Sequence, residues 1–265
     1  MNDNRPIGVF DSGIGGVTVL SKLAEMLPNE DFIYVGDTLN CPYGVKTPQE
    51  IADLVTNVAK FLLKNDVKAI VIACNTATAN SGHLKDITDV PVIGVIEPTA
   101  NYAYKLSKNK NIAVLATNAT IDSKKYEGYL EKKRLFKKGK RHYIKCSEFV
   151  PVVEGLKMGT EEAKKIVNDK INCLKDKKID TVILGCTHFG LLSKEILDVL
   201  PKANLVGCGK PTGEKLISVL KESGKLGRTN KFGTIKMYTT GDPKSMEEQI
   251  VWFDKAYEPV QKIEI

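Results

Sequence analysis

The chain has 265 residues, of which 42% are hydrophobic, and this is enough for a substantial core in one large or two modest domains. It contains no apolar signal-peptide core, no apolar run near the ~18 residues of a membrane span and no C-x-x-C pair among its 6 cysteines. We therefore expect a cytoplasmic protein without membrane contacts, disulfides or metal, whose net charge of +7 mildly favours an anionic substrate.

A Gly-rich turn follows the first predicted strand. The strand Pro6–Phe10 runs into Asp11–Gly16 (D-S-G-I-G-G), which opens a helix with an apolar stripe. Glycines let backbone N–H groups face a bound anion, whereas Asp11 would repel a phosphate and could hold an ammonium group or assist a thiol. The alternative is a tight strand-to-helix turn whose glycines adopt positive φ.

The next elements lead toward a cysteine. Phe32–Gly36 is predicted as the second strand, and the loop Asn40–Gly44 (N-C-P-Y-G) follows it. Thr47 and Glu50 form a capping box with Pro48 between them at the first helical position, so an amphipathic helix is predicted from there to residue 64.

Two apolar runs that end in cysteine form a matched pair, Lys68–Thr78 (K-A-I-V-I-A-C-N-T-A-T) and Asp180–Phe189 (D-T-V-I-L-G-C-T-H-F). Each run is typical of a strand buried on both faces of a parallel sheet. Ligands of such sheets bind beyond the carboxyl ends of the strands, where Cys74 and Cys186 lie. A lone cysteine is more often a buried structural residue, but two cysteines in matching positions favour a functional pair.

The remaining sequence alternates strands with helices. Glu154 is predicted directly after the extended segment His142–Phe149. Further helices are predicted over Ala77–Ile87, Ile121–Lys133, Thr160–Lys177, Leu191–Leu200, Glu214–Lys221 and Pro243–Tyr257. The basic stretch Lys124–Lys145 has no accompanying nucleic-acid motif, so we interpret it as a solvated surface and expect no nucleic-acid partner.

This alternation predicts an α/β fold of two pseudo-symmetric domains with mostly parallel sheets. The last strand, near residues 234–239, could return to the sheet of the first domain. The first domain would then comprise residues 1–97 and 210–265, and the second residues 98–209, with the active site in the cleft between them.

A thiol on each face of one substrate suits inversion of an acidic carbon. One group removes the α-proton from one face, and the other delivers a proton to the opposite face. Thiols can play both parts because their ordinary pKa, about 8.5, is close to working pH. Asp11 near one cysteine and His188 near the other are candidate assistants, although His188 could equally be a structural histidine.

These segments together resemble the glutamate racemase family of the cofactor-independent aspartate/glutamate racemase superfamily. The segments that carry the resemblance are Val9–Gly16, Pro42–Gly44, Ala73–Ala77 and Leu184–Phe189, with a weaker match at Thr240–Asp242. The resemblance implies two α/β domains, interconversion of L- and D-glutamate without a cofactor, and supply of D-glutamate for peptidoglycan. We also expect a homodimer.

The resemblance assigns roles to individual residues. Cys74 matches the base for D-glutamate and Cys186 the base for L-glutamate, with Asp11 and His188 as assisting catalytic groups and Asp37 and Glu154 as further candidates. The residues that match or are candidates for substrate-binding positions are Asp11, Ser12, Tyr43, Gly44, Asn75, Thr76, Thr117, Thr120, Glu154, Thr187 and His188.

The sequence departs from the family pattern at Gly190, Ala116, Asn40 and Gly207–Gly209, and none of these touches the two cysteines in the sequence. Three alternatives stay open. The first is a related racemase that prefers aspartate or another acidic amino acid, and the second is a two-domain binding protein without chemistry. The third, a phosphate-binding enzyme built on residues 11–16, lacks the spacing and the Lys-Ser/Thr of phosphate-binding loops.

Overall fold

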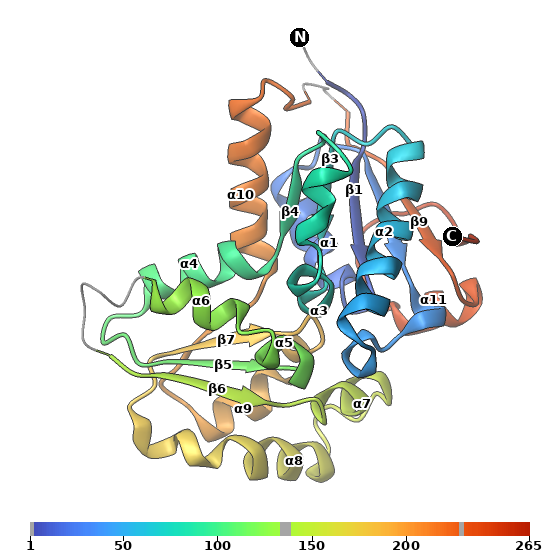
Figure 1. The fold of residues 1–265 in the computed structure, drawn as a ribbon. Coiled ribbons are helices and arrows are strands. Elements are labelled where there is room, and N and C mark those ends of the chain that lie inside the picture. Colours follow the sequence, from blue (N-terminus) through green and yellow to red (C-terminus); the bar gives the residue numbers. More distant parts are fainter. Residues whose placement is uncertain (1–2, 133–138, 228–230) are drawn as a thin grey trace. The chain divides into compact units, whose positions relative to one another are not determined.

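The computed structural model describes residues 3–132, 139–227 and 231–265. The chain forms two compact units, and the first of them is discontinuous in sequence (Figure 1). Unit 1 comprises Met1–Val95 and Gly209–Ile265, and unit 2 comprises Ile96–Cys208. The domain boundaries predicted from the sequence, after residues 97 and 209, stay a prediction.

Unit 1 is a parallel sheet with the strand order β10-β9-β2-β1-β3-β4 in the described part of the chain. Its strands are β1 (Ile7–Asp11), β2 (Phe32–Gly36), β3 (Ala69–Ile72), β4 (Val92–Gly94), β9 (Ile235–Thr239) and β10 (Gln261–Lys262). Its helices are α1 (Val17–Met26), α2 (Pro48–Lys64), α3 (Asn75–Ala79), α10 (Gly209–Glu222) and α11 (Pro243–Gln249). The return of β9 to this sheet agrees with the sequence-based expectation.

Helices cover both faces of the unit 1 sheet. The predicted capping box is present, since Thr47 and Glu50 cap α2 reciprocally, and the buried stripe of this helix packs on Phe10, Ile33 and Ile70. α1 and α10 lie against each other (Figure 1). Their approach is close, because a Cβ added at Gly213 of α10 would lie 2.5 Å from the sulfur of Met26.

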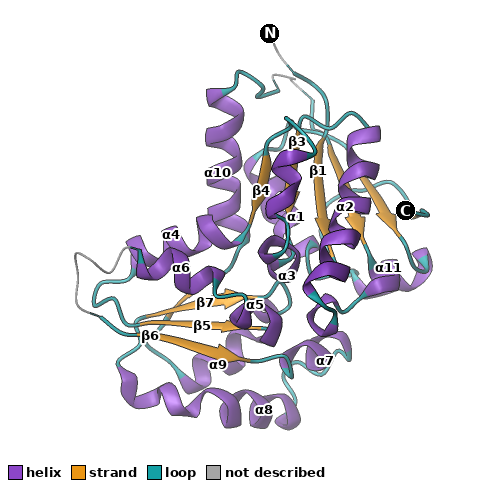
Figure 2. Cartoon of the chain, viewed as in Figure 1, coloured by secondary structure: helices purple, strands orange, loops and turns teal. Residues whose placement is uncertain are grey.

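Unit 2 is a second parallel sheet, with the order β6-β5-β7-β8 (Figure 2). Its strands are β5 (Ile112–Ala116), β6 (Arg141–Lys145), β7 (Thr181–Gly185) and β8 (Asn204–Val206). Its helices are α4 (Ile96–Leu106), α5 (Asn118–Asp122), α6 (Lys125–Glu131), α7 (Phe149–Glu154), α8 (Glu161–Ile171) and α9 (Ser193–Val199).

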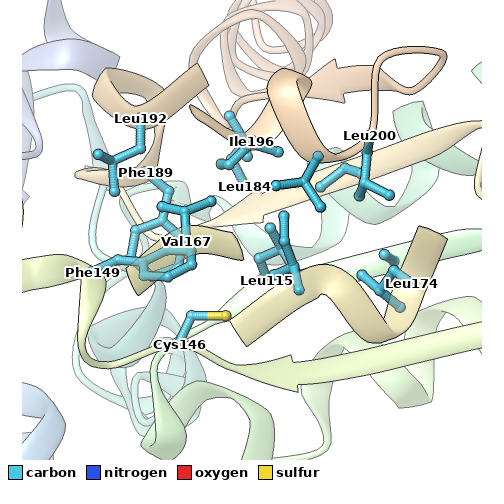
Figure 3. Close-up of a cluster of buried hydrophobic side chains, with 14 of the residues drawn as sticks. Leu115, Cys146, Phe149, Val167, Leu174, Leu184, Phe189, Leu192, Ile196 and Leu200 are labelled. Carbon is cyan, nitrogen blue, oxygen red and sulfur yellow. The ribbon is translucent and has the colours of Figure 1, made fainter. Parts of the chain in front are cut away.

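A cluster of buried apolar side chains joins α7, α8 and α9 to the unit 2 sheet (Figure 3). The rings of Phe149 and Phe189 meet edge to face within it, with centroids 5.1 Å apart. Phe149 opens α7, and Phe189 follows the predicted catalytic segment after β7, so this aromatic contact fixes α7 beside that segment.

The two sheets repeat one connectivity. The order β2-β1-β3-β4 in unit 1 matches β6-β5-β7-β8 in unit 2. The register also matches, because Ile7 pairs with Ala69 at the start of one central pair and Ile112 pairs with Thr181 at the start of the other. The prediction of an α/β fold with parallel sheets is therefore confirmed, and the internal repeat seen in the sequence is a repeat of strand order.

Several predicted helices are shorter in the structure. The segment after Cys74 is a short α-helix followed by a 3₁₀ turn at Gly82–Asp86, and α11 ends at Gln249, before Trp252. Glu154 ends a helix, α7, and does not directly follow a strand as predicted. Residues 133–138, the centre of the predicted basic stretch, lie outside the described residues.

Candidate active site

In each unit, the predicted cysteine lies where the direction of strand addition reverses. In unit 1 the chain passes from β1 to β2 on one side, and then to β3 on the other side of β1. Unit 2 repeats this path with β5, β6 and β7. Ligands of open parallel sheets bind at such switch points, beyond the carboxyl ends of the strands. Cys74 follows β3 and Cys186 follows β7, so each unit presents a thiol at its own switch point.

Polar contacts hold Cys74 in place. It is the N-cap of α3, and its Sγ accepts a hydrogen bond from the Ala77 backbone N–H at 3.4 Å. Its Sγ also lies 3.5 Å from the hydroxyl oxygen of Ser12, which follows the adjacent strand β1. A donor N–H and a hydroxyl both favour the thiolate form of a cysteine. The side chain is 7% exposed, so this thiol is nearly buried.

Asp11 ends β1 next to Ser12. Its carboxylate is buried and accepts a hydrogen bond from the Gly13 backbone N–H at 3.0 Å. The turn after it needs glycine for close packing, since a Cβ at Gly16 would lie 2.4 Å from the Asp11 Cβ. Gly13 and Gly16 are not among the residues with positive φ, so the alternative of a turn built on positive-φ glycines is wrong.

Tyr43 lies in the loop after β2, in the same unit as Cys74 and Asp11. The Tyr43 hydroxyl donates to the Asp37 carboxylate at 2.6 Å, and both side chains are buried. Burial raises the pKa of Tyr43 well above its usual range, and the charge of Asp37 raises it further. Tyr43 is therefore a neutral donor at any working pH. Gly44 follows it in a 3₁₀ turn, and Asn75 and Thr76 are buried at the start of α3.

The surroundings of Cys186 are different. Its Sγ lies 3.5 Å from Nδ1 of His188, and the other ring nitrogen of that buried histidine, Nε2, lies 3.5 Å from a carboxylate oxygen of Glu154. The carboxylate can stabilise a protonated imidazole, and a protonated imidazole favours the thiolate. Glu154 thus joins the predicted pair from the end of α7.

Threonines complete the unit 2 half of the site. Thr117 caps α5, accepts from the Thr120 backbone N–H and donates to the Thr120 hydroxyl at 3.0 Å. Its position after β5 corresponds in register to that of Ser12 after β1. Thr187 is buried between Cys186 and His188. The predicted residues thus form two groups, one on each unit.

A protein-family model described as Asp/Glu/Hydantoin racemase matches residues 7–208. A glutamate racemase from Enterococcus faecalis is 40% identical over 253 residues, which cover 94% of this chain and 91% of the relative. A glutamate racemase from Pediococcus pentosaceus is 39% identical over 248 residues, 93% of either protein. The chain belongs to the glutamate racemases of this family.

Solved structures of glutamate racemases have the same fold. A Bacillus anthracis isoform superposes with a TM-score of 0.93 at 34% identity, covering 100% of this chain and 99% of its own. The Francisella tularensis enzyme, solved with D-glutamate, has a TM-score of 0.89 at 33% identity, with 99% and 98% covered. The chain is accordingly an isomerase, as the sequence predicts.

Two buried tyrosines of this racemase were missed at the sequence level. Tyr34 of β2 donates to the Gly13 carbonyl at 2.8 Å and so fixes the turn after Asp11. Tyr126 of α6 packs beneath the Cys186 segment, where a Cβ at Gly185 would lie 3.2 Å from its ring. Burial raises the pKa of both tyrosines. Tyr34 lies in an apolar run, as ordinary core residues do, and Tyr126 lies in a charged stretch, so neither carried a sequence signal of its role.

Neither a metal centre nor a membrane span is found in the parts of the chain that the structure describes. Over those residues, no group of three or more His, Cys, Asp or Glu side chains is arranged to hold a metal ion. No helix in the same ranges is long and apolar enough to cross a bilayer. None of the six cysteines, all within the described residues, forms a disulfide.

Proposed function

We propose that this racemase interconverts L- and D-glutamate by a two-base proton transfer, with Cys74 and Cys186 acting on opposite faces of one Cα. The observation that carries this proposal is the equivalence of the two thiols. Each follows the same strand of a repeated four-strand pattern, and each has a polar partner within 3.5 Å of its sulfur. A single base, or a protein that only binds glutamate, would not require the second thiol.

The reaction balances without an oxidant or a reductant. With L-glutamate, the Cys186 thiolate takes the α-proton and becomes a thiol, which leaves a carbanionic intermediate. The Cys74 thiol then gives its proton to the opposite face and becomes a thiolate. With D-glutamate the two thiols exchange parts. Asp11 assists proton transfer at Cys74, and His188 assists it at Cys186.

The other predicted residues hold the substrate. The hydroxyl and amide groups of Ser12, Asn75, Thr76 and Thr187 suit the two carboxylates and the ammonium group of glutamate. Tyr43 with Gly44, and Thr117 with Thr120, extend this polar surface on their own units, while Asp11 and Glu154 supply the negative charge that an ammonium group prefers. An enzyme that prefers aspartate stays the alternative, because these groups bind any acidic amino acid.

The biological setting is inferred from the family. We propose a cytoplasmic enzyme whose D-glutamate supplies peptidoglycan synthesis, since a reducing compartment keeps both catalytic thiols reduced. We expect a homodimer, which size-exclusion chromatography with light scattering can test. We also expect activity to survive dialysis against a chelator, and a loss of activity that added metal restores would contradict this.

Exchange in deuterated water tests the proposal. L- or D-glutamate is incubated with the enzyme, and the α-proton signal and the optical rotation are followed together. Early in the reaction, the product enantiomer should carry deuterium while the remaining substrate keeps its proton, because different thiols serve the two faces. Deuterium in both enantiomers at equal initial rates would indicate one base. Faster turnover of aspartate than of glutamate would favour the alternative substrate.

A further inference from the structure

The segment that follows β9 contacts the loop that carries Tyr43. β9 pairs with β2 along its whole length, so the residues after the two strands emerge side by side. The residues after β9 are Thr240 and Gly241, and those after β2 are Asp37 and Thr38. The family model ends at residue 208, so it does not include the β9 side of this contact.

Asp37 is the centre of the contact. Its buried carboxylate accepts hydrogen bonds from three side chains, the Tyr43 hydroxyl at 2.6 Å, the Thr240 hydroxyl at 2.7 Å and the Asn40 amide at 2.9 Å. A buried carboxylate needs such donors, and each donor is fixed in return. The Tyr43 hydroxyl and the Thr240 hydroxyl are bound to different oxygens of the same carboxylate.

Thr240 also binds the loop backbone. Its hydroxyl oxygen accepts from the Leu39 backbone N–H at 3.1 Å, so one side chain holds both Asp37 and the chain just after it. The neighbouring Thr38 and Thr239 hydroxyls are 2.6 Å apart. Gly241 is required here, because a Cβ would lie 2.4 Å from the Thr38 hydroxyl oxygen. Valine at position 240 would fill the same space but could make neither hydrogen bond.

We propose that Thr240 is a positioning residue of the active site, which orients Tyr43 for substrate through Asp37 and fixes the 38–44 loop through Leu39. This inference rests on the proposed function, in which Tyr43 and Gly44 bind glutamate. Thr240 itself need not touch the substrate. Its contribution is to keep the Tyr43 hydroxyl, which is buried together with Asp37, in one orientation before the substrate arrives.

The chain offers a matched control on the same strand. Thr234, just before β9, donates its hydroxyl to the Asp31 carboxylate at 2.8 Å, just before β2. This is the same kind of hydrogen bond between the same two strands, at the end away from Tyr43. Thr240→Val and Thr234→Val therefore each remove a threonine hydroxyl that binds a carboxylate across one strand pair, at its buried and its exposed end.

The experiment compares Thr240→Val, Thr240→Ser and Thr234→Val for kcat and KM with both glutamate enantiomers, and for melting temperature. We expect Thr240→Val to raise KM for both enantiomers by about 10-fold, the loss that one ordinary hydrogen bond produces, with kcat little changed. Thr240→Ser should have the KM of the wild-type enzyme. Thr234→Val should also keep that KM, even if its melting temperature falls. Tyr43→Phe should raise KM similarly, and adding Thr240→Val to it should have little further effect.

The outcomes separate this inference from the proposed function. Suppose the wild-type enzyme is active, but Thr240→Val leaves KM unchanged or Thr234→Val changes KM as much as Thr240→Val does. Either result overturns the positioning role and leaves the proposed function standing. Additive effects of Thr240→Val and Tyr43→Phe also overturn the positioning role. If the wild-type enzyme does not exchange the α-proton of glutamate, the proposed function itself fails.

Discussion

The Cys74 and Cys186 regions have the same topology and different chemistry. Cys74 caps a short helix, is nearly buried, and has a hydroxyl and a backbone N–H as its partners. Cys186 is partly exposed and lies against His188, whose ring faces the carboxylate of Glu154. The groups named beside the Cys74 sulfur are neutral, whereas the group beside the Cys186 sulfur can itself be charged.

The repeated strand order determines where the two cysteines lie, but it does not determine which side chains surround them. The strand order places a thiol at each switch point, where ligands of open parallel sheets bind. How each thiolate is stabilised depends on side chains that differ at corresponding positions, since Thr76 occupies the place in unit 1 that His188 occupies in unit 2. The two half-reactions should therefore respond differently to substitution.

Among substitutions that keep both thiols, those of the assisting groups should have the largest effect. Asp11→Asn and His188→Asn should each lower the rate of racemisation by about 10²–10⁴-fold, the usual loss of acid–base assistance. Both directions slow, because every turnover passes through both proton transfers. The α-deuterium isotope effect should show which of the two proton transfers has slowed. It should increase for L-glutamate in His188→Asn and for D-glutamate in Asp11→Asn.

The isotope effects also provide the control for these two variants. A raised KM with an unchanged isotope effect for either enantiomer would mean that the residue only binds substrate. The same change in both variants and both enantiomers would mean that the two groups do not serve separate thiols.

A smaller effect is expected from Glu154. Glu154→Gln keeps the size of the side chain and removes the charge that faces His188. Because the Glu154 carboxylate is exposed to solvent, we expect only about a 2–5-fold loss of kcat/KM. The loss should disappear in the His188→Asn background. Additive losses in the double variant would show that Glu154 acts on the substrate and not on the imidazole.

Alkylation compares the two thiols without turnover. With iodoacetamide at pH 8, Cys186 should react faster than Cys74, because it is more exposed, and glutamate should protect both. Cys146 should stay unmodified, since burial raises its pKa to about 12 and it remains a thiol at this pH. Peptide mass spectrometry, with the exposed Cys173 as the internal reference, can check the order. Faster labelling of Cys74 would contradict the difference in access.

The sequence predicted the parts of this architecture that local patterns specify. The buried strands β3 and β7 are continuous apolar runs, and the start of α2 is specified by Thr47 and Glu50. The end of α3 was missed: the helix stops at Ala79, and a separate 3₁₀ turn follows at Gly82–Asp86 where one continuous helix was predicted. The position of Glu154 depends on the contact between Phe149 and Phe189, which joins distant segments and leaves no local signal.

The contacts of the candidate site divide in the same way. The cysteines, Asp11 and His188 were predicted from motifs, and the short distance from His188 to Cys186 follows from their separation of two residues. The Ser12 contact with Cys74 and the Thr240 contact with Asp37 join residues that lie 62 and 203 positions apart. Such contacts depend on strand order, which a single sequence does not specify.

The most direct test of the two-thiol account uses Cys74→Ser and Cys186→Ser with the separate enantiomers of a glutamate analogue that carries chlorine at Cβ. Elimination of chloride needs one base and no second proton donor, while serine is too weak an acid to replace a thiol at neutral pH. Neither variant should racemise glutamate. Cys74→Ser should still eliminate chloride from the L form through Cys186, and Cys186→Ser from the D form through Cys74. Near wild-type racemisation by either variant, or the same surviving enantiomer in both, would contradict the account.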